Sequence, residues 1–182
     1  ANSDAAMAIL VTHISAATAA LGWMVCEWIK VGKPSALGLV TGSIAGLAAI
    51  TPASGSVGPL GAIVIGAVSA ALCYWACTTI KSRFQYDDSL DVFGVHGVGG
   101  FVGTILVAFF GSPSLGGKVE GLEMGKQLGT QLFAAIVVTI FTLVVTLVIL
   151  KILQATIGLK VDEQDEVIGL DLSDHGESGY NG

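Results

Sequence analysis

The stretch QYDDSLDVFGVHGVGGFVGTILVAFF, residues 85–110, decides how this sequence folds and where its chemistry lies. Three carboxylates, those of Asp87, Asp88 and Asp91, come before a long apolar segment in which His96 is the only ionisable side chain. A titratable side chain in an apolar membrane segment is costly unless it is paired or faces a polar path, so it marks a functional site. We therefore take His96 as the first candidate functional residue.

The composition is typical of a membrane protein. Of the 182 residues, 53% are hydrophobic and 12% are charged, with a mean hydropathy of +0.79, whereas about a quarter of the residues of soluble proteins are charged. A helix needs about 20 residues to cross a bilayer. The predicted spans are residues 5–29, 35–51, 59–81, 88–111 and 124–158. The sequence thus predicts an all-α, polytopic membrane helix bundle with five spans in residues 1–160.

Basic residues predict the orientation, because loops in the cytoplasm retain Lys and Arg. The first loop carries Lys30 and Lys33, the third carries Lys81 and Arg83, and Lys160 follows the fifth span. We therefore expect a multi-pass protein of the cytoplasmic membrane, with the N-terminus of this chain outside and its C-terminus in the cytoplasm. Since an apolar run follows the first residues, ANSD, without a leader or an initiator Met, we expect the chain to continue a longer sequence.

Residues 161–182 form a predicted acidic cytosolic tail, with seven of the fourteen Asp and Glu residues and no Lys or Arg. Low hydrophobicity and high charge are typical of disordered ends. A docked or regulatory tail is the alternative, because the segment also carries apolar side chains that could anchor it. These are Val167, Ile168, Leu170, Leu172 and Tyr180.

Small residues recur at the spacing of helix interfaces. The three series are Gly38, Gly42 and Gly46; Gly94, Gly97, Gly100 and Gly103; and Gly121, Gly125 and Gly129. Close backbone approach supplies the packing energy of helices in lipid, so we interpret most of these glycines as structural. The stripe around His96 could also line a narrow passage. Cys26, Cys73 and Cys77 lie in apolar runs, and their odd number gives no disulfide framework, so we interpret them as packing residues.

Asp88-Ser89-Leu90-Asp91 predicts a helix start. Asp88 would cap the free backbone N–H groups, and Asp91 would lie in the first turn, where the helix dipole favours negative charge. Asp88 could also act on cations through its field. His96 would then lie about 12 Å deeper along the axis. Burial favours an uncharged imidazole with one donor and one acceptor nitrogen; a histidine that is merely satisfied within the core is the alternative.

The other polar side chains of the apolar runs have simpler interpretations. His13 lies near Thr12, Ser15 and Thr18, whose hydroxyl groups could satisfy it, so we expect a structural role. Glu27 and Lys30 have the spacing of a weak ion pair on one helix face. The motifs of soluble enzymes, such as phosphate loops, zinc-protease helices and serine elbows, do not occur. We therefore expect no enzyme, and also no cofactor, no metal site and no nucleic-acid partner.

Three stretches resemble the ammonium transporter (Amt/Mep/Rh) family. They are GKPSALGLVTGSIAGLAAITPASG (residues 32–55), DDSLDVFGVHGVGG (87–100) and GLDLSDHGESGY (169–180). The resemblance covers essentially the whole chain. It implies half of an eleven-helix fold made of two inverted repeats, namely its seventh to eleventh helices and cytosolic tail, with the N-terminal half of the same protein missing. It also implies a homotrimer with one pore per subunit.

The resemblance also assigns roles to particular residues. His96 resembles the second member of the family's twin-histidine pair in the pore, and Val92, one turn earlier, resembles a pore-lining apolar residue. Asp88 matches an acidic position near the cytoplasmic start of that helix. The tail resembles an extension that lies under the pore and helps a PII-type signalling protein to dock. Its matching residues are Gly169, Leu170, Asp171 and Tyr180.

The function that the resemblance implies is transport of ammonium or ammonia across the lipid bilayer. A bare cation pays a large cost in a low dielectric, whereas ammonia is neutral. An uncharged pore histidine could accept the proton, or a hydrogen bond, from ammonium so that ammonia passes. We expect this chain alone not to conduct. The alternatives are an ammonium-sensing or PII-interacting membrane module and an unrelated membrane scaffold.

Overall fold

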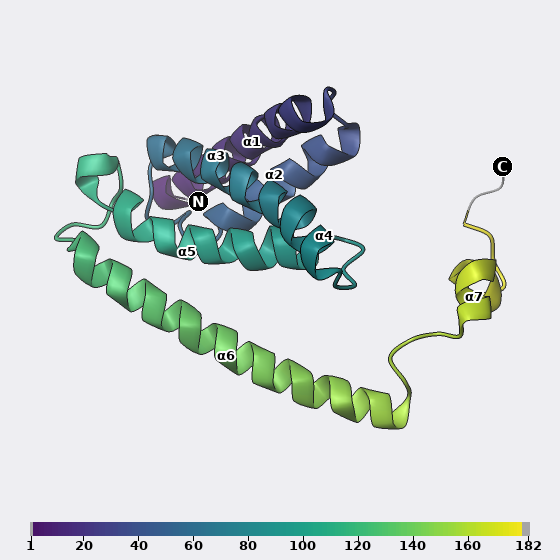
Figure 1. The fold of residues 1–182 in the computed structure, drawn as a ribbon. Helices are drawn as coiled ribbons and strands as arrows, with labels where there is room; N and C mark the ends of the chain where they lie inside the picture. Colours follow the sequence, from purple (N-terminus) through teal and green to yellow (C-terminus); the bar gives the residue numbers. More distant parts are fainter. Residues whose placement is uncertain (1, 180–182) are drawn as a thin grey trace. The chain divides into compact units, whose positions relative to one another are not determined.

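The computed structural model describes residues 2–179, and helices are the only regular elements among them (Figure 1). This confirms the predicted all-α class. The chain divides into two compact units, Ala1–Ala135 and Ile136–Gly182. Its α-helices are α1 (Ser3–Val31), α2 (Ala36–Ile50), α3 (Pro59–Trp75), α4 (Lys81–Phe84), α5 (Val98–Phe110), α6 (Met124–Thr156), α7 (Glu163–Ile168) and α8 (Leu170–Ser173). Two π-helical segments, η1 (Ala76–Ile80) and η2 (Phe93–Gly97), and a short 3₁₀ turn, η3 (Pro113–Leu115), complete the list.

Four of the described helical segments are long and apolar enough to cross a membrane. They are Ser3–Val31, Pro59–Phe84, Phe93–Phe110 and Met124–Thr156. The segment Pro59–Phe84 joins α3, η1 and α4, and Phe93–Phe110 joins η2 and α5. The second predicted span, residues 35–51, forms α2, which has only 15 residues. At 1.5 Å per residue α2 is about 22 Å long, less than the roughly 30 Å of a hydrocarbon core.

Local hydrogen bonds set the ends of α1 and α2. The Asn2 side chain accepts from Ala5 N at 2.9 Å at the start of α1, and Gly32 ends that helix with a left-handed φ of 86°. The Ser35 hydroxyl accepts from Gly38 N at 2.8 Å and so caps α2. Glu27 accepts from both the N and the Oγ of Ser35, at 2.7 and 2.9 Å. The expected pair of Glu27 with Lys30 is therefore wrong, because the turn after α1 brings Ser35 to this carboxylate.

Glycine and serine let α1, α2 and α3 pack closely in the first unit. The Ser15 hydroxyl donates to the Gly46 carbonyl at 2.9 Å, and both residues are buried. On the α3 side, a Cβ added to Gly66 would lie only 2.6 Å from the Ser15 carbonyl oxygen. On α2, a Cβ on Gly42 would overlap Trp23. These contacts confirm that the first glycine series serves packing. The buried apolar residues around them are Val11, Ala49, Ile50, Ala53, Val57, Ala62, Ile65 and Val107.

The third glycine series does not pack within the described chain, contrary to our expectation. A Cβ on Gly125 or Gly129 would meet nothing within 4 Å, and Gly121 has a left-handed φ of 68° in the loop before α6. None of the residues of α6 is buried. A small residue buries area only where a second helix approaches it, so the spacing of these glycines did not by itself specify a contact.

Candidate functional site

The segment that carries His96 begins later than the sequence predicts. Helical geometry starts at Val92, four residues after Asp88. The Asp88 carboxylate still reaches the helix, because it accepts from Val92 N at 2.8 Å and Phe93 N at 2.9 Å. Asp91 is not in the first helical turn: it comes before the helix, in a left-handed conformation with a φ of 56°. A residue in the left-handed conformation cannot belong to a regular right-handed helix. The helix therefore begins after Asp91, later than the sequence predicted.

An ion pair closes the turn between α4 and η2. The Lys81 ammonium lies 2.7 Å from the Asp91 carboxylate, and both side chains are about 30% exposed (30% and 31%). The Tyr86 ring lies edge-on to Phe93, with 5.7 Å between the centroids. The buried Tyr86 hydroxyl has no hydrogen-bond partner among the described residues. Burial, and then the negative charge of Asp88, raise the pKa of Tyr86, so its phenol stays protonated at neutral pH.

The π-helical segment η2 rotates the glycine face of the helix. Gly94, Gly99 and Gly103 are buried against the rest of the unit, whereas Gly97 is exposed and Gly100 is half-buried. In a π turn each carbonyl bonds five residues ahead, so a step of five residues joins Gly94 to Gly99. The predicted stripe therefore does not pack as a whole within this unit, because two of its members, Gly97 and Gly100, do not face inward.

His96 and Val92 lie on the outer side of this segment. Both are exposed in the described chain, Val92 with 52% of its surface. They are four residues apart, and the buried residues between and after them face the opposite way. The His96 ring makes no hydrogen bond or ion pair with any described residue. The structure therefore brings these two candidate residues to one free face and leaves the imidazole available to a partner or a solute.

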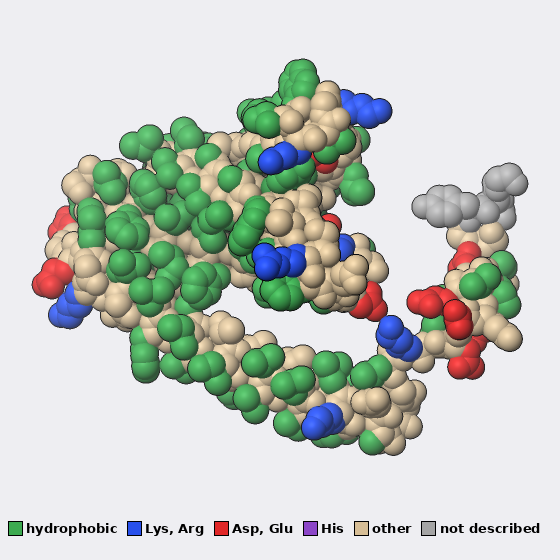
Figure 2. Space-filling view, viewed as in Figure 1, with side chains coloured by type: hydrophobic (Ala, Val, Ile, Leu, Met, Phe, Trp, Pro, Cys, Tyr) green, Lys and Arg blue, Asp and Glu red, His purple; other side chains and the backbone are tan. Residues whose placement is uncertain are grey.

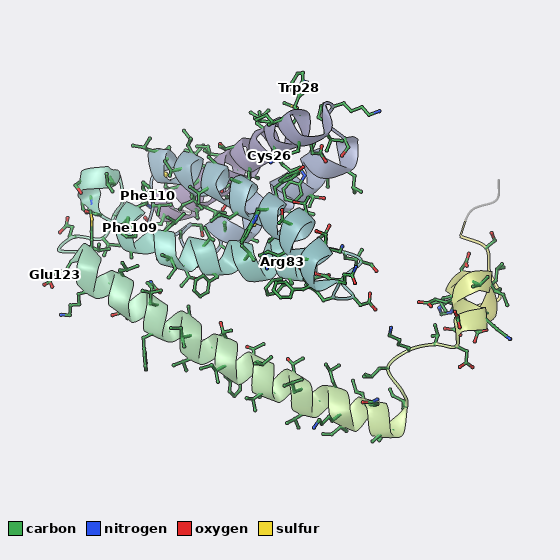
Figure 3. All side chains as sticks on the ribbon, in the orientation of Figure 1. Cys26, Trp28, Arg83, Phe109, Phe110 and Glu123 are labelled. Atoms are coloured by element: carbon green, nitrogen blue, oxygen red, sulfur yellow. The ribbon has the colours of Figure 1, made fainter. Side chains whose placement is uncertain are left out.

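The first unit is apolar along most of its length and carries charged side chains of both signs at the end where α1 and α4 finish. Figure 2 shows hydrophobic side chains over most of the first unit, with Lys, Arg, Asp and Glu at the end where α1 and α4 finish. Lys30 lies in the last turn of α1, and Lys81 and Arg83 lie in α4. Figure 3 marks this end by Arg83 and the opposite end of α5 by Phe109 and Phe110. The capped turn before His96 thus lies at the charged end of the unit.

His13 does not join His96. It is exposed beside an open groove of about 560 Å³ that α1 and α2 line. The neighbouring Ser15 hydroxyl donates to Gly46 instead, and the His13 ring has no hydrogen bond within residues 2–179. The expectation that local hydroxyl groups satisfy this ring is therefore wrong. The same described part of the chain holds no group of three His, Cys, Asp or Glu side chains placed to bind a metal ion.

The tail forms a closed turn after two short helices. Gly169, between α7 and α8, has a φ of 100°, which favours glycine. The Asp171 carboxylate accepts from Gly179 N at 2.9 Å, and its backbone carbonyl accepts from Glu177 N at 2.9 Å. The bond from Gly179 lowers the pKa of Asp171. Leu170 is 42% exposed. Tyr180 lies outside the described residues.

Sequence reasoning missed several residues that shape the site. The pairing of Lys81 with Asp91 had a visible signal, since opposite charges end one span and precede the next. The orphaned hydroxyl of Tyr86 had none, because a tyrosine in a loop is ordinarily solvated. The contact of Cys77 with Gly94 could not be predicted either, since no sequence pattern indicates the two π-helical segments.

Comparison with known proteins identifies the relatives of this chain. The profile of the Ammonium Transporter Family matches residues 1–180. An ammonium transporter of Aquifex aeolicus is 45% identical over all of this chain, which covers 43% of that protein. The ammonium transporter Amt1 of Archaeoglobus fulgidus is 46% identical over 99% of this chain and 46% of its own length. The chain thus spans less than half the length of these relatives. The resemblance that the sequence predicted is confirmed.

Solved structures show the same fold. The N240A mutant of Candida albicans Mep2 matches with a TM-score of 0.81 and 34% identity, over 96% of this chain and 40% of that one. A structure named Sensor Amt Protein matches with a TM-score of 0.86 and 29% identity, over 96% of this chain and 43% of that one. The matched family is one of transporters, so the prediction that the chain is not an enzyme is also confirmed.

Proposed function

Because this chain belongs to the ammonium transporter family, we propose that it forms part of a membrane protein that carries ammonium or ammonia across the bilayer. The observation that carries the proposal is the position of His96. It is the single ionisable side chain in its apolar segment, and it is exposed without a partner in the described chain. A side chain of this kind is costly in lipid unless it faces a polar path.

The chemistry of an uncharged imidazole suits this substrate. Moving a bare cation into a low dielectric costs tens of kcal/mol by idealised Born estimates. Imidazole can accept a hydrogen bond, or the proton itself, from ammonium, and neutral ammonia can then continue past apolar side chains such as Val92. Potassium has no proton to donate, so the same site would discriminate by chemistry as well as by size. We assign His96 and Val92 to the pore, and Asp88 and Asp91 to the helix start beside it.

The pore needs more chain than these residues. The face with Val92 and His96 is open in this chain, and a closed route requires a second wall. We propose that further helices of the same protein supply that wall, with a partner for His96, and that three copies assemble. The purified 182-residue chain in liposomes should then give no ammonium flux above that of empty vesicles; a flux that saturates with ammonium would contradict this.

Replacing His96 tests the role of the pore histidine. In the full-length transporter, His96→Ala should strongly reduce methylammonium uptake or change its selectivity against potassium, because the acceptor nitrogen is gone. His13→Ala is the matched control, since it removes another exposed histidine from a membrane helix, and its uptake should stay at the parental level. Parental uptake and selectivity in His96→Ala would remove the assigned role.

A sensor function is the second candidate, and the tail favours it. The turn that Asp171 closes is held by hydrogen bonds, and one matched structure is named a sensor. In this case the membrane region would report ammonium through residues 161–182 to a partner such as a PII-type protein, with the tail in the cytoplasm. Gly169, Leu170, Asp171 and Tyr180 would form the regulatory segment. Deleting residues 161–182 should then abolish the partner's response and leave uptake largely intact, whereas loss of uptake alone would favour transport.

A further inference from the structure

The two π-helical segments of this chain lie against each other. Segment η1 lies between α3 and α4 in the membrane segment Pro59–Phe84, and η2 opens the segment Phe93–Phe110. The turn of Lys81 and Asp91 connects the two segments. Residues of η1 contact residues of η2. π turns are rare, because they insert an extra residue into a helix, and they are frequent at functional sites. Two such turns in contact, one of them carrying His96, indicate that they stabilise each other.

A close contact between Cys77 and Gly94 joins these segments. A Cβ on Gly94 would overlap the Cys77 Sγ and would lie 3.1 Å from the Cys77 backbone nitrogen. One helical turn before Cys77, the buried Cys73 thiol lies 3.8 Å from the Val95 carbonyl oxygen, to which it donates a weak hydrogen bond. Both thiols therefore touch the two residues that come directly before His96.

This contact sets the rotation of the helix around His96. Gly94 and Val95 are buried, with Val95 only 3% exposed, whereas His96 is exposed. Across the π turn the buried face continues from Gly94 to Gly99, five residues on. In a regular α-helix residues three and four apart share a face, so without the π turn the inward positions after Gly94 would be residues 97 and 98. The imidazole would then take a different direction relative to the bundle.

We propose that Cys77 and Gly94 are positioning residues: their contact holds the π turn of η2 and so fixes the direction in which His96 faces the substrate route. The proposal rests on the proposed function for the part that concerns transport. It predicts that residues 94 and 77 are coupled: a larger side chain at residue 94 is tolerated only when the side chain at residue 77 is smaller.

The test uses four variants of the full-length transporter: Gly94→Ala, Cys77→Ala, the double variant, and Cys77→Leu. Gly94→Ala and Cys77→Leu should each lower maximal methylammonium uptake by roughly tenfold or more, because displacements of about 1 Å can cost that much. Cys77→Ala alone should have a small effect. The double variant should recover most of the uptake that Gly94→Ala loses, since removal of Sγ leaves only the contacts with the Cys77 backbone, at 3.1 and 3.3 Å. Gly99→Ala is the matched control, because its Cβ would lie 3.4 Å or more from every neighbour.

Three further readouts separate positioning from folding. Gly94→Ala should change the selectivity against potassium and the pH profile of uptake, and should speed hydrogen exchange of residues 93–98, with all three restored in the double variant. An uptake loss that follows the amount of folded protein, with parental selectivity, pH profile and exchange, would overturn the proposal. So would a double variant no better than Gly94→Ala. If His96→Ala keeps parental uptake, the proposed function fails instead, and the exchange data still decide whether Cys77 holds the π turn.

Discussion

Lys81 and Asp91 are ten residues apart and form an ion pair at 2.7 Å across the turn that precedes His96. Asp91 takes the left-handed conformation there, which costs a residue other than glycine some backbone energy. The ion pair and the two hydrogen bonds to Asp88 offset this cost. Side chains on both sides of the turn therefore hold the start of the helix that carries the histidine.

Breaking the ion pair should loosen this turn by a modest amount. Partly exposed ion pairs contribute roughly 0.2–1 kcal/mol, so Lys81→Met and Asp91→Asn should each lower the melting temperature in detergent by a few degrees. Asn also tolerates the left-handed conformation, which makes Asp91→Asn a change of charge alone. The melting temperature of the double variant should be no lower than that of the less stable single variant. Additive losses would show that the two side chains stabilise the protein independently.

Removing the Asp88 carboxylate should have a larger effect, because it accepts from two backbone N–H groups. Loss of a helix cap costs about 0.5–2 kcal/mol, and Asp88→Ala leaves both Val92 N and Phe93 N without this acceptor. Asp88→Asn retains one side-chain oxygen and should lie between Ala and the parent. Chemical denaturation in detergent, followed by circular dichroism, measures the order. An Asn variant as damaged as the Ala variant would point to charge, and not capping, as the main contribution.

The sequence predicted the helices well, because apolar runs in a membrane protein are long and few. Their ends were harder to predict. Asn2 and Gly32 are ordinary cap residues, and they bound α1 at Ser3–Val31, two residues beyond each end of the predicted span 5–29. Glu27 was assigned to Lys30 on its own helix, whereas its partner is Ser35, eight residues on. The turn after Gly32 brings Ser35 to the Glu27 carboxylate. A rule based on spacing within one helix does not predict contacts across a turn.

The roles of the candidate site residues stay predictions, but the helical register around them differs from the one that the sequence predicted. His96, Val92 and Asp88 were chosen from the sequence, and the structure places the first two on one exposed face. The glycine stripe was assigned with α-helical spacing, so the step from Gly94 to Gly99 was missed. A π turn depends on contacts with a neighbouring helix, here through Cys77, and the local sequence does not encode them.

Gly103 should tolerate no side chain at all. A Cβ there would overlap the Ala49 backbone carbonyl, and a carbonyl within α2 cannot move away as a side-chain end can. Overpacking of this kind costs roughly 1–3 kcal/mol, so Gly103→Ala should lower the yield of folded protein and its melting temperature. Gly99→Ala, in the same helix, serves as the comparison and should stay near the parent. Equal stability of the two variants would mean that α2 and α5 are not held at this distance in the membrane.

The turn of the tail should open at low pH. The bond from Gly179 lowers the pKa of Asp171 below its ordinary value. A carboxyl group with a lowered pKa in the folded state contributes stability above its unfolded pKa, near 3.9, and this stability is lost as the pH falls through the lower, folded value. In the intact protein in nanodiscs, the Gly179 amide resonance should therefore move towards its disordered position only in acid, below pH 4 or thereabouts. Asp171→Asn keeps an acceptor oxygen but has no proton to gain, so its Gly179 resonance should lose this transition. A transition that persists in Asp171→Asn would assign the acid opening to another carboxyl group of the tail.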